Sequence, residues 1–387
     1  PFGPRPRCQG GAREHICLDI DHDHMQARLA LSGFAGDVWP NPDGPPLLVM
    51  RRVEDPALPT VLVYGHGDVI RAQDGLWEDG LAPFTLTQRE DRLYGRGTAD
   101  NKGQHLINLL AMESVLEARG ALGFNMTWLI EMGEEVGSPG LDRFCGAHRA
   151  LLEADVLIAS DGPRVRADVP TIFLGARGSS NFDLTVDLRD GAHHSGNWGG
   201  LLADPAIILA QALACITDAR GVIRVPGWRP NSLTGALRQH LAALPAPGTG
   251  GPTVDPDWGE PGLSAAEKVY GWNSFAVLAM TTGQPEAPVN AINGQARATC
   301  QLRFVVGTEP ERILPDLRAH LDAHGFEMVQ IAPLREGYFP ATRAALDNPW
   351  VRRVAASVET TLGTPPDLLP NLGGSLPNHV FARTLGL

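Results

Sequence analysis

The stretch TVLVYGHGDVI, residues 60–70, decides the fold. It opens with the apolar run of a buried strand, and it ends with His66 between two glycines and with Asp68 directly after them. Glycines allow the backbone to turn sharply. In open α/β sheets, ligands bind outside the carboxyl ends of the strands. The stretch therefore predicts a core strand that delivers an imidazole and a carboxylate to a site.

Two later segments repeat this arrangement. Residues 124–135, FNMTWLIEMGEE, form an apolar run that ends in Glu134 and Glu135. Residues 155–163, DVLIASDGP, form another that ends in Asp161. Between these strands the sequence predicts a hairpin and two helices, at residues 86–97, 101–119 and 140–154. Apolar strands that alternate with helices predict an α/β fold with a mainly parallel sheet, covered on both faces.

Six polar side chains are expected to converge at the carboxyl edge of this sheet, since Asp100 directly precedes the first of these helices. They are His66, Asp68, Asp100, Glu134, Glu135 and Asp161. Taken singly, each has an ordinary structural explanation, such as turn formation for Asp161 before Gly162 and Pro163. Five carboxylates around one imidazole repel one another unless a cation neutralises them. Their coincidence at three strand ends therefore predicts a metal site.

Composition limits the other possibilities. The chain has 387 residues, enough for two domains, and a net charge of -12, which argues against a general nucleic-acid binder. No apolar run approaches the length of a membrane span, and no secretion signal opens the sequence. Five widely spaced cysteines without a CxxC pair favour reduced thiols and a cytoplasmic location.

The N-terminal segment lacks a helical or strand period and is expected to be a flexible polar terminus. It contains a cluster of acidic and histidine residues that could bind a metal, although the polar terminus is the better interpretation. The cluster consists of Asp19, Asp21, His22, Asp23 and His24.

Seven motifs together resemble one known family. In chain order they are YGHGDV, YGRGTADNKG, EMGEEVGSPGL, ASDGP, GAHHSGNWGG, PVNAINGQARATCQLRF and NLGGSLPNHVF. The sequence is similar to the co-catalytic zinc exopeptidases and amidohydrolases, which include carnosinase-like dipeptidases, acetylornithine deacetylase, succinyl-diaminopimelate desuccinylase, aminoacylase and glutamate carboxypeptidase. The resemblance runs from Tyr64 to the C-terminus.

The resemblance implies two zinc ions per subunit, with manganese or cobalt as alternatives, and a role for each residue at the predicted site. His66 and Asp161 would bind one ion, Glu135 the second, and Asp100 both. Asp68 would hydrogen-bond His66, and Glu134 would be the general base. A cis peptide bond is implied between Asp100 and Asn101.

The resemblance also implies an inserted α+β lid that forms a homodimer. We place the lid at residues 177–335 and the catalytic domain at 1–176 and 336–387. Within the lid, the sequence predicts a half-buried strand at 179–190 and a strand–helix–strand segment at 301–333. His194 would stabilise the oxyanion in the partner subunit's site. The implied substrate-binding residues are Asn290, Arg303, Gly374 and Ser375.

The second ion also needs a histidine. His379 is one candidate, but the family's order of loops favours a histidine beyond Leu387. We expect residues 381–387 to begin a strand, and the protein to continue past Leu387 with the last strand and helix of the sheet. Which histidine serves stays open.

The favoured function is metal-dependent hydrolysis of an amide bond in a small peptide, because Asp161 and the GGSLP segment resemble the dipeptidase branch. An N-acyl-amino-acid deacylase is the alternative within the enzyme class. An inactive binding protein on the same fold is the alternative outside it, but such a protein is expected to have lost Glu134 or Asp100. The sequence lacks the G-x-S-x-G, G-x-G-x-x-G and H-E-x-x-H motifs of serine hydrolases, dinucleotide enzymes and single-zinc proteases.

Overall fold

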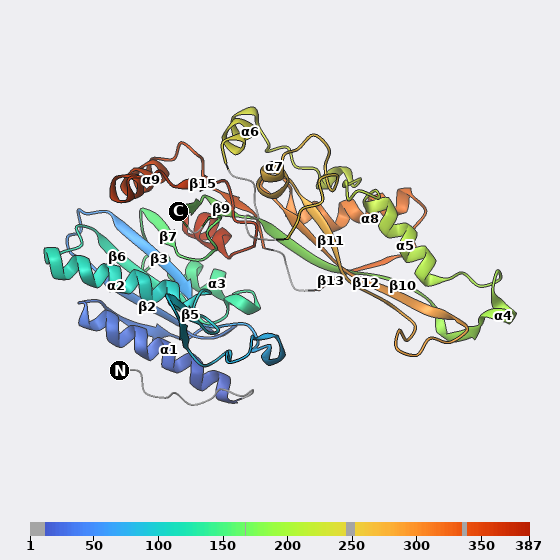
Figure 1. The fold of residues 1–387 in the computed structure, drawn as a ribbon, viewed down its shortest axis with the longest axis horizontal. Coiled ribbons are helices and arrows are strands. Elements are labelled where there is room, and N and C mark those ends of the chain that lie inside the picture. The colour runs from blue at the N-terminus through green and yellow to red at the C-terminus, as the bar shows by residue number, and fades with distance from the viewer. Residues whose placement is uncertain (1–11, 167, 245–251, 335–338) are drawn as a thin grey trace. The chain divides into compact units, whose positions relative to one another are not determined.

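The computed structural model describes residues 12–166, 168–244, 252–334 and 339–387, with side chains from His22 onward (Figure 1). The chain forms two compact units. The first contains the described residues up to Pro163 together with Val380–Leu387, and the second runs from Arg164 to His379. The functional boundaries expected at 176/177 and 335/336 stay a prediction.

The first unit is built on a five-stranded sheet with the order β1-β2-β6-β3-β7. β6 and β7 both pair with β3 in parallel, whereas β1 and β2 add an antiparallel edge. The mainly parallel sheet is therefore confirmed. The strands are β1 (Ala35–Trp39), β2 (Leu47–Arg52), β3 (Thr60–His66), β6 (Asn125–Glu131) and β7 (Val156–Ala159).

Helices cover both faces of this sheet. Along β3, Val61 and Val63 pack with α1 (Ala12–Leu31) and α2 (Lys102–Arg119), because successive side chains of a strand point to opposite faces. Leu62 and Tyr64 pack on the other face with α3 (Leu141–Ala147) and the π-helix η5 (Val380–Leu385). β3 is therefore buried on both sides, which explains its continuous apolar run.

The local expectations for this unit are largely confirmed. The hairpin forms from β4 (Thr87–Arg89) and β5 (Arg92–Tyr94), and a short 3-10 helix η1 (Asp74–Leu76) precedes it. α2 ends where Gly120 adopts φ 75° and donates its N–H to the Leu116 carbonyl. α3 ends seven residues earlier than expected, and the chain continues from it as turns.

Two terminal expectations are wrong. From Ala12 onward the N-terminal segment is helical, and the later part of α1 packs on the sheet core through Met25 and the fully buried Leu29, a tertiary contact that leaves no clear period in the sequence. The last residues form η5 rather than a strand. There Val380 and Phe381 are buried, and the Phe381 ring lies 4.8 Å from the Tyr64 ring.

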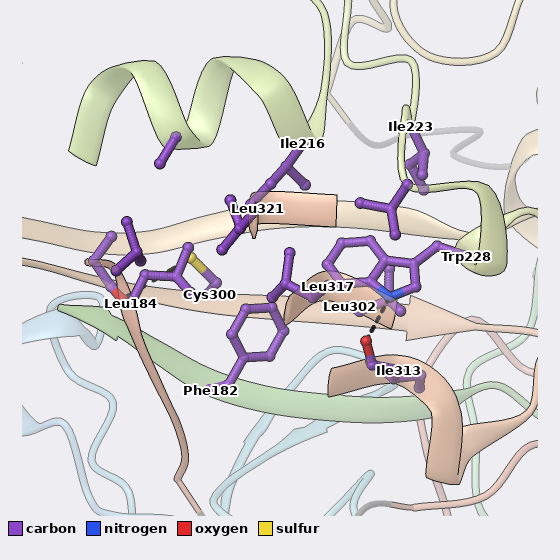
Figure 2. Packing of buried hydrophobic residues seen from close by; sticks show 14 of the residues in the cluster. Phe182, Leu184, Ile216, Ile223, Trp228, Cys300, Leu302, Ile313, Leu317 and Leu321 are labelled. Carbon is purple, nitrogen blue, oxygen red and sulfur yellow. Dashed lines mark hydrogen bonds between the residues drawn. The ribbon is translucent and has the colours of Figure 1, made fainter. Parts of the chain in front are cut away.

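The second unit contains an antiparallel four-stranded sheet with the order β11-β12-β10-β13. Two helices, α5 and α8, lie over one face, and the core between them contains Phe182 and Trp228 (Figure 2). The Trp228 indole N–H donates to the Ile313 carbonyl at 2.9 Å. These elements are β10 (Gly178–His194), α5 (Pro205–Ile216), β11 (Ser274–Thr282), β12 (Ala291–Phe304), α8 (Ile313–Ala323) and β13 (Gln330–Pro333). The expected strand–helix–strand order from β12 to β13 is confirmed.

Further helices and short strands complete the second unit. The helices are α4 (Ser195–Trp198), η3 (Pro226–Trp228), α6 (Gly235–Ala242), α7 (Ala265–Tyr270), η4 (Pro310–Arg312) and α9 (Pro349–Leu362). The strands are β8 (Thr171–Phe173), β9 (Gly175–Ala176), β14 (Thr342–Arg343) and β15 (Asp367–Leu369). Among the described helices of the whole chain, none has both the length and the apolar character needed to cross a bilayer.

Candidate metal centre

His66, the last residue of β3, lies at the middle of the predicted cluster. Its ring is buried, and Nε2 is 3.0 Å from Asp100 Oδ1, 3.6 Å from Asp161 Oδ2 and 4.0 Å from Glu134 Oε2. Asp161 follows β7, and Glu134 begins the 3-10 helix η2 (Glu134–Val136) after β6. The carboxyl ends of three neighbouring parallel strands thus bring these groups together, as the sequence predicts.

Asp68 connects the imidazole to the loop after β6. Its Oδ1 lies 3.3 Å from His66 Nδ1 and accepts the Glu134 N–H at 3.2 Å, while Oδ2 accepts the Glu135 N–H at 3.0 Å. One carboxylate therefore orients the ring and also fixes the backbone that carries both glutamates. The two hydrogen bonds that Asp68 accepts from this backbone were not predicted from the sequence.

Asn101 and His105 hold the other side of β3, and sequence reasoning missed both. Asn101 is fully buried. Its amide oxygen accepts the His66 N–H at 3.3 Å, and its amide nitrogen donates to the Ser160 carbonyl at 2.6 Å. His105 Nε2 lies 2.8 Å from the His66 carbonyl. The Asp100–Asn101 peptide bond is cis, as the resemblance implies.

Glu131, the last residue of β6, provides a further buried carboxylate beside His66. Glu131 accepts hydrogen bonds from Tyr64 Oη at 2.5 Å and from Ser138 Oγ at 2.8 Å, and burial raises its pKa to about 7. Sequence reasoning also missed this network. The signal was available, because Glu131 is a charged residue inside an otherwise apolar strand.

The protein alone supplies too little positive charge to neutralise the carboxylates at this edge of the sheet. Burial is the main reason that the pKa of Glu134 is raised to about 8 and that of Asp161 to about 6. The neighbouring carboxylates raise both pKa values further, whereas His66 lowers them. Asp161 Oδ2 is buried and accepts no hydrogen bond from the part of the chain that the structure describes. Burial lowers the pKa of His66, but its contacts with Asp100 and Asp68 outweigh this and raise it to about 11. An added positive charge would relieve this imbalance.

The donor set fits a metal ion. One ligand atom from each of His66, Asp100 and Asp161 lies within 4.8 Å of the other two. Imidazole and carboxylate are zinc ligands. Glu135 lies near this group, and burial and then the charge of Asp100 raise the pKa of its carboxyl. Asp100 is the most exposed of the three, which leaves the centre open on one side.

The site residues expected in the second unit form two separate groups. His194, at the end of β10, accepts the Gly196 N–H on Nδ1 at 3.1 Å, and the Asn290 carbonyl accepts the neighbouring Ser195 N–H. At the other end of the sheet, Arg303 donates to Ser375 Oγ at 3.0 Å. The Gly374 carbonyl accepts the Arg177 N–H, and an Arg177 guanidinium N–H reaches the Arg303 carbonyl.

Two candidate histidines outside the centre can also be placed. His379 lies in a helical turn before η5, and its ring meets the Phe339 ring edge-on at 6.3 Å. His22 is buried within α1, whereas the side chains of Asp19 and Asp21 are outside the described residues.

Comparisons with known proteins agree with this geometry. The profile of Peptidase family M20/M25/M40 matches residues 62–385. The Beta-Ala-His dipeptidase of Mus musculus is 35% identical over 195 residues, which cover 48% of this chain and 39% of that protein. The Cysteinylglycine-S-conjugate dipeptidase of Corynebacterium striatum is 31% identical over 254 residues, covering 63% and 53%. The aligned parts thus span only about two fifths to half of these curated relatives.

Solved structures show the same fold. An M20 family metallo-carboxypeptidase from Sulfolobus solfataricus superposes with a TM-score of 0.80 at 24% identity, covering 95% of this chain and 84% of that one. Human carnosine dipeptidase 1 gives a TM-score of 0.74 at 23% identity, covering 94% and 81%.

Proposed function

The chain belongs to peptidase family M20/M25/M40, and we propose that it is a metal-dependent dipeptidase. One observation carries the proposal: His66, Asp100 and Asp161 converge at the sheet edge, with Glu134 beside them. An inactive binding protein would not need both a metal-ligand set and an adjacent proton carrier.

We propose zinc as the metal and two ions per subunit. His66 and Asp161 would hold one ion, Glu135 the other, and Asp100 would contribute to both. The Asp161 oxygen without a hydrogen bond supports its part in this set. When bound, the ions supply Lewis-acid chemistry, since they acidify water and polarise the substrate carbonyl. Asp68 would keep the His66 ring oriented through Nδ1.

Glu134 is the proton carrier in this proposal. It would take a proton from the attacking water and return it to the leaving amine. Its carboxyl is largely buried at the edge of the cluster, and its pKa, raised to about 8 by burial, would fall towards neutrality beside a cation. A carrier with a pKa near the working pH can both accept and donate.

Substrate would be held by residues of the second unit. Arg303 can bind a carboxylate through its guanidinium fork, and Ser375 and Gly374 lie beside it. His194 would stabilise the oxyanion. Its Nδ1 accepts a backbone N–H, so the neutral ring carries its proton on Nε2, which could therefore donate a hydrogen bond to the oxyanion. Asn290 lies next to it.

The spacing of these groups supports a homodimer. In the β10–β12 ladder, His194 pairs with Ala291, twelve residues from Arg303 on β12, which corresponds to about 40 Å. A dipeptide cannot span this distance, so His194 and Arg303 would act on one substrate only if they came from different subunits. β11 offers a surface for pairing, because it is an edge strand with exposed Val277, Leu278 and Met280.

The proposed substrate is a dipeptide with a free amino group, and an N-acyl amino acid is the second candidate. The relatives named as dipeptidases favour the first. We also propose a cytoplasmic location, which the free thiols of Cys145, Cys215 and Cys300 support.

A substrate panel tests the proposal. The chelated protein would be assayed with and without added Zn²⁺ against dipeptides and against N-acetyl and N-succinyl amino acids. We expect zinc-dependent hydrolysis of dipeptides. Faster hydrolysis of the N-acyl compounds would assign the deacylase function instead, and no hydrolysis of either class by the zinc-loaded protein would contradict an enzymatic role.

A further inference from the structure

Three potential metal ligands lie together in the second unit, apart from the candidate metal centre. Cys215 is in the last turn of α5, His320 is in the last turn of α8, and His324 is the C-cap of α8. One ligand atom from each lies within 4.8 Å of the other two, and the two imidazole centroids are 4.2 Å apart. A thiol and two imidazoles form a donor set that favours zinc.

In each of the two rings, one nitrogen donates a hydrogen bond and the other keeps a lone pair that could bind a metal. His320 Nε2 lies 2.8 Å from the Cys215 carbonyl, so it must donate there, and the neutral ring keeps its lone pair on Nδ1. His324 Nδ1 lies 2.7 Å from the His320 carbonyl, so the lone pair is on Nε2. A histidine that binds a metal usually donates its other N–H to a carbonyl or carboxylate, as both rings do here.

The core beneath the cluster fixes the spacing of the ligands. Ile216 and Leu321, the residues next to Cys215 and His320, are fully buried, and Figure 2 shows both side chains directed into the core. α5 and α8 therefore hold Cys215 and His320 without any metal. His324 is exposed, which gives an ion access from solvent.

We propose that Cys215, His320 and His324 form a zinc site that is independent of the candidate metal centre and links the C-terminal ends of α5 and α8. Water would complete the coordination, because three protein ligands leave one tetrahedral position open. Binding releases one proton, since the thiol, which now donates to the Ala212 carbonyl, must become a thiolate. The ion would act as a clamp between the two helices.

Cobalt absorption tests the proposal on the full chain after chelation. A thiolate ligand gives Co²⁺ a sulfur-to-metal charge-transfer band, whereas the centre at His66 offers only nitrogen and oxygen donors. We expect the band in the wild-type protein and its loss in Cys215→Ser. His324→Ala, a change at an exposed position, should weaken Co²⁺ binding at this site by more than about tenfold.

A matched control and a zinc count complete the test. His240 on α6, whose Nε2 lies near the Leu368 carbonyl of β15, is a comparable half-buried histidine, and His240→Ala should leave the band unchanged. Equilibrium dialysis should show one more Zn²⁺ bound to the wild-type protein than to Cys215→Ser. An equal zinc count with no band at saturating Co²⁺ would mean that the histidines only cap carbonyls at the ends of α5 and α8, and a band that persists in Cys215→Ser would place the thiolate elsewhere. Either result would overturn the proposal.

Discussion

Replacing Asp68 with asparagine should weaken both zinc binding and catalysis, although the side chain keeps its shape. The carboxylate accepts two backbone N–H groups, from Glu134 and Glu135, and also faces His66 Nδ1. Asparagine has one acceptor oxygen, so its amide group must face at least one of these donors. A lost hydrogen bond to a charged group costs about 1.5–3 kcal/mol, which corresponds to roughly 10- to 150-fold at 1.4 kcal/mol per tenfold.

The measurements are zinc affinity, by competition with a chromophoric chelator, and kcat/KM for a dipeptide. Asp43→Asn is the matched control, because it removes the same charge from an exposed pair with Arg143. We expect it to change either quantity by no more than about twofold. If Asp68→Asn behaves like Asp43→Asn in both measurements, Asp68 does not position the ligand and the proton carrier as reasoned here.

Three further predictions follow from other parts of the site. Burial raises the pKa of Glu131 from 4.5 to about 7, so its contribution to stability is complete below pH 4.5 and is lost as pH rises through 7. In denaturant unfolding of the chelated proteins, the free energy of unfolding of Glu131→Gln should rise by about 2–3 kcal/mol relative to that of the wild type between pH 5 and pH 8. Free energies of unfolding that change in parallel with pH in the two proteins would refute this. Arg303→Lys should raise KM for a dipeptide while changing kcat less, because lysine loses the bidentate fork; an unchanged KM would remove Arg303 from the substrate site. Mixing inactive His194→Ala and Glu134→Ala subunits should restore activity through heterodimers with one intact site, and no recovery after demonstrated subunit exchange would exclude the arrangement in trans.

The sequence predicted the elements that are buried on both faces. β3 and β6 read as continuous apolar runs because both of their faces are buried, and polar residues stand out where such runs end. β7 also reads as an apolar run, although it is an edge strand with an exposed Ile158. The strand pattern alone therefore predicted that His66 and Asp161 lie at the same edge of the sheet.

The missed features depend on tertiary contacts. α1 has no clear apolar period, although Met25 and Leu29 pack on the core. The strand expected at 381–387 rested on the family's order of loops, whereas Val380 and Phe381 pack in a helical turn instead. Asn101 and His105 act on the backbone of β3, a contact that leaves no spacing signal in the sequence. The cluster of Cys215 with His320 needed the packing of α5 on α8 to be found.

The effect of Glu134→Gln on turnover and metal content tests the central claim most directly. Glutamine keeps the size of the side chain but cannot carry the proton, so kcat for a zinc-dependent dipeptide hydrolysis should fall by at least about 10²–10⁴-fold. Zinc bound per subunit, measured on the same sample, should equal that of the wild type, because His66, Asp100, Glu135 and Asp161 are the proposed ligands. A Glu134→Gln enzyme that retains kcat within about tenfold of the wild type, with its zinc still bound, would contradict the account.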